Sequence, residues 1–196
     1  MPHGVYLLSG HEGPYALERF ACAPGPAGWR YVATREDPDS GVRTGRLDVV
    51  LDAAGRALRV HVEAGGWQLR GGAVGAPGGG SVLWRRGDVE REERAAGFTG
   101  TSPVGAVAAA RRLGPDPGPG QPAPVRLRLV RLGDEALATL VVDEAWSRSG
   151  TQERDGVLVQ RWDVADLATG ERRALSLSGD VLVQAPRVQL LELTLT

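Results

Sequence analysis

One short segment constrains the fold of this 196-residue chain more than any other. Residues 104–110 read Val-Gly-Ala-Val-Ala-Ala-Ala and carry no polar side chain. Ser102 is a good N-cap, Pro103 suits the first helical position, and Gly114-Pro115 predicts a stop, so we expect a helix over 103–113. A helix that is apolar all round is buried on every side. At about 16 Å it is too short to cross a membrane, so strands have to surround it.

The chain on both sides of this segment alternates apolar and polar residues with a period of two. In 46–52 and 58–63 the apolar side chains, Leu58 among them, share one face, and a short Asp-x-x-Gly turn between the runs predicts a β-hairpin. His61 is expected on the outer, polar face. Short connections imply sequential antiparallel pairing. Further strands are predicted at 15–22, 29–35, 67–74, 81–86, 125–131, 136–146, 157–164, 172–177, 181–184 and 188–195.

These patterns predict a mainly β fold in one domain, 1–196. About nine or ten antiparallel strands form a strongly curved sheet, a half-barrel, wrapped around the central helix at 103–113. Strands occupy 1–98 and 125–196, and a Pro/Gly-rich crossover at 114–124 connects the helix to the second group. The helix residues are small, so the space beside them is either filled by large side chains from the strands or left as a pocket.

Charge and composition exclude several classes of protein. The 23 basic residues, all arginine, are interspersed with 24 acidic ones, so no basic patch for nucleic acid or anionic lipid is expected. The absence of lysine excludes Schiff-base and Walker-type lysines. No apolar run is long enough for an integral membrane segment. A lone Cys22 and the lack of a visible secretory signal predict a cytoplasmic protein.

The residues that could perform catalysis form no complete motif. The segment 100–104 lacks the second glycine of a G-x-S-x-G elbow, so Ser102 is interpreted as an N-cap. His3, His11 and His61 have no metal-ligand spacing with one another or with a cysteine. We therefore expect no catalytic residue, no metal and no cofactor. The hypothesis that the protein is an enzyme, with Ser102 or a histidine in catalysis, stays open as an alternative to a binding function.

Three further features are interpreted as structural. The charge cluster at 85–94 is expected to be a solvated loop or helical turn. The glycine-rich segment 71–81 is expected to be a hairpin loop and not a phosphate site, because no helix follows it. The carboxylate pairs Asp143-Glu144 and 134–135 are expected to be surface charge, because neighbours in a strand point to opposite faces.

Five tryptophans against two phenylalanines suggest an apolar pocket, although tryptophan is also ordinary core filling. Trp67 and Trp84 fit pocket lining best, because they lie near the glycine-rich loop. The residues predicted to line a pocket between sheet and helix are Trp67, Trp84, Phe98, Val104, Val107, Ala108, Trp146 and Trp162.

The hairpin and the strand after it, residues 45–52, 59–62 and 66–71, also carry a resemblance. The chain has a group of strands, then one buried helix, then more strands. In this order it resembles the half-barrel folds of bacterial lipoprotein carriers. It is most similar to a family of cytoplasmic bacterial proteins described as glycolipid-binding. The resemblance implies a half-barrel around a helix and a binding function. It covers a local stretch of alternation with a tryptophan and assigns no site residue.

We therefore expect a non-enzymatic protein that binds an apolar or amphipathic small molecule, of glycolipid or fatty-acyl type, in a cavity between curved sheet and helix. Each buried methylene would contribute about 0.8 kcal/mol to binding. The alternative is a structural or protein-interaction module that forms a homo-oligomer, such as a homodimer, through an exposed sheet face or edge.

Overall fold

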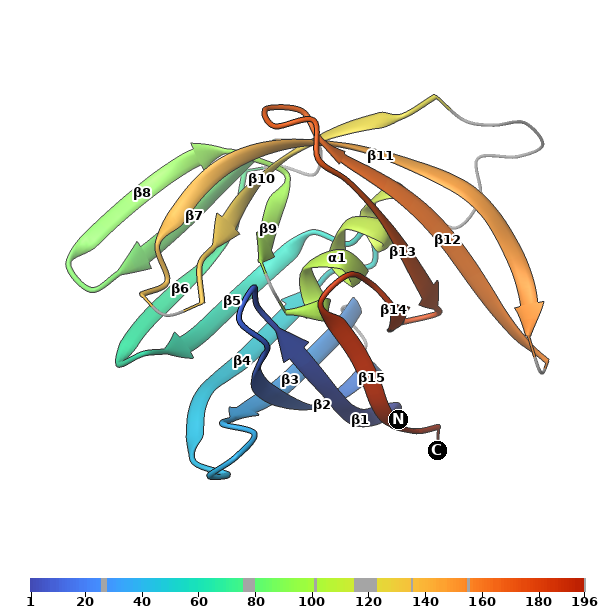
Figure 1. Ribbon diagram of the computed structural model, residues 1–196. Helices are drawn as coiled ribbons and strands as arrows, with labels where there is room; N and C mark the ends of the chain where they lie inside the picture. Colours follow the sequence, from blue (N-terminus) through green and yellow to red (C-terminus); the bar gives the residue numbers. More distant parts are fainter. Residues whose placement is uncertain are drawn as a thin grey trace.

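The computed structural model describes residues 1–25, 28–75, 80–100, 102–114, 123–134, 136–154 and 156–195. These residues form fifteen strands and one helix, α1 (Pro103–Leu113). Curved strands lie on both sides of α1, which sits near the middle of the molecule (Figure 1). The predicted β half-barrel around a single helix is confirmed.

The first sheet has nine strands in the order β15-β1-β2-β3-β4-β5-β6-β7-β8, all paired antiparallel. Except between β15 and β1, its neighbours follow one another along the chain, as the short connections predicted. Its strands are β1 His3–Ser9, β2 Pro14–Gly25, β3 Gly28–Glu36, β4 Arg43–Leu51, β5 Ala57–Ala64, β6 Trp67–Val74, β7 Ser81–Arg86, β8 Val89–Arg94 and β15 Val188–Thr194.

The second sheet has six strands in the order β14-β13-β12-β11-β10-β9. All pair antiparallel except β9 and β10, which are parallel and lie on either side of α1 in the sequence. Its strands are β9 Gly97–Gly100, β10 Val125–Leu132, β11 Thr139–Arg154, β12 Val157–Asp166, β13 Arg172–Ser178 and β14 Val181–Gln184. The single curved sheet of nine or ten strands is thus corrected to two sheets, with one core of residues from both sheets and the helix.

The helix begins and ends where the sequence predicts. Val104 N–H donates to Ser102 Oγ at 3.4 Å, and Gly114, with φ 85°, donates its N–H to the carbonyl of Arg111. No residue of α1 is exposed. An all-apolar helix needs cover on every side, and the two sheets supply it.

Two local predictions are wrong. Residues 85–94 are not a loop or a helical turn: they contribute to β7 and β8, and β8 is an edge strand whose charged side chains discourage edge-to-edge association. The β4–β5 hairpin forms as predicted, with Leu47 opposite Val62. A bulge pairs Ala57 with Leu51, however, and leaves Leu58 exposed, so Leu58 does not share the buried face. An extra residue in a bulge disrupts the alternation of faces.

The structure describes two of the predicted loop segments only in part. The centre of the predicted crossover, 115–122, and of the glycine-rich loop, 76–79, lie outside the described residues. No helix among the residues described is both long and apolar enough to span a membrane.

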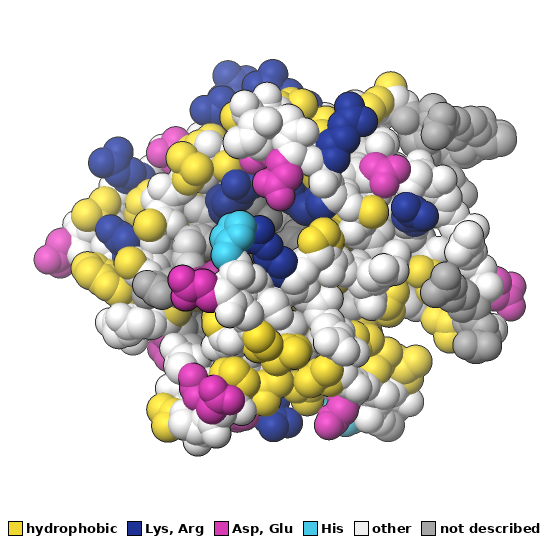
Figure 2. All heavy atoms as spheres, viewed as in Figure 1, with side chains coloured by type: hydrophobic (Ala, Val, Ile, Leu, Met, Phe, Trp, Pro, Cys, Tyr) yellow, Lys and Arg dark blue, Asp and Glu magenta, His cyan; other side chains and the backbone are white. Residues whose placement is uncertain are grey.

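The face seen in Figure 2 is hollowed near its centre, with arginine side chains around the hollow. Hydrophobic side chains gather lower down on this face, where Figure 1 places β1 and β15.

Candidate functional site

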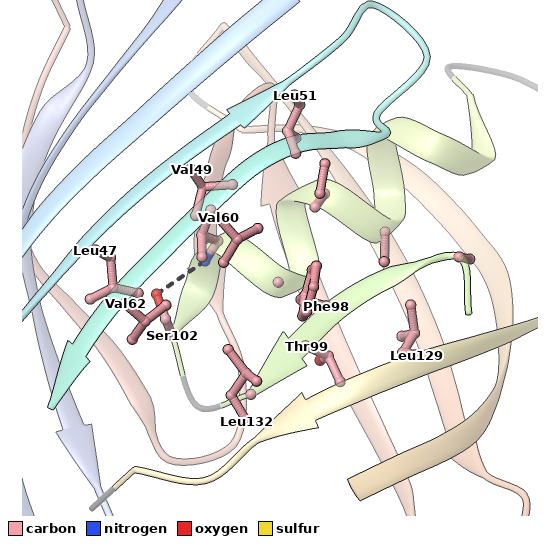
Figure 3. A pocket seen from close by; sticks show the side chains of 18 of the residues that line it. Leu47, Val49, Leu51, Val60, Val62, Phe98, Thr99, Ser102, Leu129 and Leu132 are labelled. Carbon is pink, nitrogen blue, oxygen red and sulfur yellow. Dashed lines mark hydrogen bonds between the residues drawn. The ribbon is translucent and has the colours of Figure 1, made fainter. Parts of the chain in front are cut away.

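A small cavity lies between α1 and the strands β4, β5, β9 and β10 (Figure 3). It encloses about 60 Å³, well below the roughly 300–1,000 Å³ of pockets for drug-sized ligands. Its size therefore suits a small apolar group or the end of a chain. The apolar residues that line it are Leu47, Val49, Leu51, Ala57, Val60, Val62, Ala96, Phe98, Val104, Ala108, Ala109, Leu129, Leu132 and Leu137.

Small residues on α1 create this cavity. A Cβ on Gly105 would lie 3.0 Å from the Cα of Thr99, so the missing side chain lets the helix approach the β9 backbone closely. Ala108 and Ala109 face the cavity with a single methyl group each. Larger side chains there would occupy the volume that now remains empty.

The C-terminal end of α1 is positioned by the turn between β4 and β5. Gly55 has φ +74°, and a Cβ on it would lie 2.5 Å from the backbone nitrogen of Arg112. Asp52 orders the same turn, because its Oδ1 accepts hydrogen bonds from the backbone N–H groups of Ala54 and Arg56 at 2.9 and 2.8 Å. Only glycine allows this contact between turn and helix.

The other end of the cavity is polar and centres on Glu18 of β2, which is fully buried. Its carboxylate accepts hydrogen bonds from Tyr31 Oη at 2.6 Å, Ser102 Oγ at 2.8 Å and Arg35 Nε at 2.9 Å. Arg35 Nη1 also donates to Asp134 Oδ1 at 3.0 Å. Arg35, Ser102 and Asp134 line the cavity at this end, and Arg112 lines it near the C-terminal end of α1. The walls are therefore mostly apolar, with charged residues near both ends of the helix.

The protonation of this polar end follows from its surroundings. Burial raises the pKa of Tyr31 well above its usual value, and the charge of Glu18 and the hydrogen bond to it act in the same direction. Burial opposes the charge on Arg35, but attraction and hydrogen bonding from Glu18 outweigh it, so the pKa of Arg35 is raised. Tyr31 is therefore a neutral donor and Arg35 a cation at neutral pH.

A second buried carboxylate, Glu144 of β11, lies in the other sheet. It accepts hydrogen bonds from Trp146 Nε1 at 3.0 Å, Arg131 Nη2 at 3.2 Å and Arg173 Nη2 at 2.7 Å. The prediction that the pair Asp143-Glu144 is surface charge is therefore wrong for Glu144. Alternation does send the two carboxylates to opposite faces, and one of those faces is the core.

The signal for both buried glutamates was present in the sequence. Glu18 lies two residues from Ala16 and Phe20, and Glu144 lies two residues from Val142 and Trp146; all four neighbours are buried. A carboxylate at an apolar position of an alternating strand points into the core with them. The tyrosine and arginines that satisfy it cannot be identified from that pattern.

The predicted pocket residues divide into three groups. Phe98, Val104 and Ala108 line the cavity. Four others pack in the core away from it: Trp84, Val107, Trp146 and Trp162. Trp67 lies outside this cavity: it is 44% exposed, and the centre of its ring lies 4.9 Å from the Arg86 guanidinium carbon.

No histidine lines the cavity. His61 Nε2 lies 3.5 Å from Glu63 Oε1, and His11 lies beside Arg187. Within the described ranges no group of three or more histidine, cysteine or acidic residues is placed to hold a metal ion. Burial raises the pKa of the Cys22 thiol to about 11, so it is protonated at neutral pH.

Comparison with known proteins adds a single result on the fold. No family model matches the chain, and no curated protein matches it. The crystal structure of a DUF1089 family protein from Pseudomonas aeruginosa is similar, with a TM-score of 0.57, over 86% of this chain and 89% of that one. The two sequences are 19% identical. At this identity the likeness shows a shared fold and nothing about a ligand.

Proposed function

We propose that this protein is a non-catalytic binder of an apolar or amphipathic small molecule, held between α1 and the curved strands. The observation that carries the proposal is a cavity with mostly apolar walls and a few charged residues, created by glycine and alanine on a buried helix. The apolar part of the ligand would be removed from water against the apolar walls, and its polar part would meet Arg35, Ser102 and Asp134.

Ser102 is the strongest candidate for a nucleophile, but its hydrogen bonds favour a structural role and therefore binding over catalysis. Its hydroxyl donates to Glu18 and accepts from the Val104 N–H, so it joins the helix N-terminus to β2. Glu18 in turn receives three hydrogen bonds, which suits a structural anion. The finer assignment, a glycolipid or fatty-acyl molecule in a bacterial cytoplasm, rests on the resemblance of the 45–71 region and on the lone, buried Cys22.

A series of n-alkanols of increasing length tests this proposal by isothermal titration calorimetry. We expect the Kd to fall about fourfold per methylene, because each contributes about 0.8 kcal/mol, until the chain fills the cavity. Ala108→Leu, which fills the cavity, is expected to weaken binding at least tenfold. Ala106→Leu, on the same helix but away from the cavity, is the matched control and is expected to bind normally.

Two results would contradict the proposal. One is the absence of saturable binding by every alkanol in the series. The other is an equal loss of affinity in Ala108→Leu and Ala106→Leu, which would trace the effect to helix packing. Thermal melts of both variants establish that they are folded.

A second candidate function, self-association, is favoured by the edge strand β15. It pairs only with β1 within its sheet, and Leu191 and Leu195 beside it are 46% and 62% exposed. Hydrophobic side chains gather over this region in Figure 2. Unlike β8, this edge carries few charges to prevent pairing with another strand. Sedimentation analysis is expected to give a dimer that Leu191→Glu dissociates; a monomer at high concentration would exclude this candidate.

A further inference from the structure

The exposure of its lining residues indicates where the cavity meets solvent. Of the described residues that line it, only Gly100 and Gly133 are exposed, and the opening between them is called the mouth below. Resting on the proposed function, we infer that the ligand enters this mouth tail first and that its polar head group stays there, in contact with water. The ligand is then an amphiphile with a short apolar chain end and a head group that can be bulky.

The two glycines of the mouth are neighbours in space. Gly100 ends β9 and pairs with Leu132, which ends β10, and Gly133 follows Leu132 directly. A Cβ on Gly100 would lie 2.8 Å from the carbonyl oxygen of Leu132, so the two strand ends are in close contact. Figure 3 shows Leu132 and Ser102 at one end of the cavity and Leu51 at the other. The mouth therefore lies at the end of the cavity where α1 begins.

Glycine at position 133 leaves the mouth without a covering side chain. The backbone of Gly133 is not left-handed, and a Cβ there would lie 3.5 Å from the carbonyl oxygen of Ala138, which is an ordinary contact. The backbone would therefore accept a larger residue at this position. What the absence of a side chain provides is a path from solvent to the cavity.

Leu137 is the side chain that closes this path. It lines the cavity and is 1% exposed, whereas Ala136 and Ala138 on either side of it are exposed. A single side chain of a surface segment thus reaches into the cavity beside Gly133. Its φ of 48° is left-handed, which is unfavourable for a residue with a Cβ, and strain of this kind is typical of ligand clamps. Leu137 therefore has to move aside when the tail enters.

The volume of the cavity supports the same orientation of the ligand. About 60 Å³ is less than half of the roughly 150 Å³ cavity that holds one benzene molecule in another protein, so only the end of a chain fits. Burying a polar head group without partners costs free energy. The side chain of Asp134, which lines the cavity at this end, is 29% exposed, so water reaches the mouth. An amphiphile keeps its head group hydrated there only if its tail points inward.

The test compares an n-alkanol with the n-alkyl glucoside of the same chain length, taken where the alkanol series reaches its tightest binding, by isothermal titration calorimetry. Because the head group stays outside, we expect the two Kd values to agree within about threefold. Gly133→Trp places a bulky side chain at the mouth and is expected to weaken binding of the glucoside at least tenfold more than binding of the alkanol. Gly150→Trp is the matched control, because Gly150 is exposed, is not left-handed and lies outside the cavity lining.

Leu137→Gly tests the residue that closes the mouth. Glycine adopts the left-handed backbone readily, so this variant keeps the turn and loses only the side chain. NMR line shapes across an alkanol titration give the association rate constant, which is expected to rise about tenfold in Leu137→Gly. Leu129→Ala, which shortens a buried leucine of the same cavity, is expected to leave that rate constant unchanged.

The outcomes separate this inference from the proposed function. If the alkanol binds and the glucoside does not, the head group is enclosed, and the inference is overturned while a ligand cavity stays. Equal effects of Gly133→Trp and Gly150→Trp also overturn it, and an unchanged association rate constant in Leu137→Gly removes Leu137 from the entry path. If no alkanol and no glucoside binds, the proposed function itself fails.

Discussion

Replacing Glu18 by leucine is expected to lower the free energy of unfolding by about 3–5 kcal/mol, the cost of leaving a buried charge without its partner. Glu18 is fully buried and accepts hydrogen bonds from Tyr31, Arg35 and Ser102. Without it, the buried Arg35 loses an ion pair of 2.9 Å with a carboxylate in the protein interior. Urea denaturation followed by tryptophan fluorescence measures the loss.

The double variant Glu18→Leu/Arg35→Leu is the control for this interpretation. Replacing both members of a buried ion pair by apolar residues is often close to neutral, so the double variant is expected to recover much of the stability lost in Glu18→Leu. If the stability losses of Glu18→Leu and Arg35→Leu add up in the double variant, an unpaired buried charge is not the cause. Glu18→Gln, which keeps the shape and part of the hydrogen bonding, is expected to lie between wild type and Glu18→Leu.

Replacing Gly55 by alanine is expected to destabilise the protein by about 3 kcal/mol, which is large for the addition of one methyl group. Part of the effect is the left-handed backbone, about 1–2 kcal/mol for a residue with a Cβ. The rest is contact, because the new Cβ would lie 2.5 Å from the backbone nitrogen of Arg112. The turn and the end of α1 would have to separate.

Gly170 offers a matched control. It has the same φ of +74°, and a Cβ on it would meet nothing within 4 Å. Gly170→Ala is therefore expected to show the backbone cost alone, and the difference between the two variants isolates the contact between the β4–β5 turn and the helix. Chemical denaturation of both variants measures that difference. Equal destabilisation would mean that the turn does not hold the helix end.

Much of the fold could be predicted because its signals are local. The helix at 103–113 has an N-cap, a first-turn proline and a terminal glycine in the correct order, and its apolar surface requires cover. Strands that lie between glycine-containing turn signals, such as 67–74, 81–86 and 181–184, were predicted with their observed bounds. β1, β8 and β9 were missed; of these, β8 is charged along its length and β9 has only four residues.

The candidate site was less predictable. Phe98, Val104 and Ala108 line the cavity, but most of the predicted tryptophans lie elsewhere, because size and rarity do not tell which face of a sheet a residue occupies. Trp67 is outside and Trp146 is in the core. The polar residues that give the cavity its charged end were not predicted at all. The position of Glu18 between two apolar residues of one strand face indicates burial, but it does not identify the distant groups that Glu18 contacts.

The sequence by itself determined much of the local geometry: the position of most strands, the limits of the helix, and the need to bury a helix made of small residues. Only the tertiary structure decided which distant groups meet. Glu18 and Ser102 are 84 positions apart, Arg35 and Asp134 are 99 apart, and their contacts depend on how two sheets close around α1. Backbone periodicity is a property of neighbours along the chain, whereas the pairing of buried charges depends on strand order and register across the whole molecule.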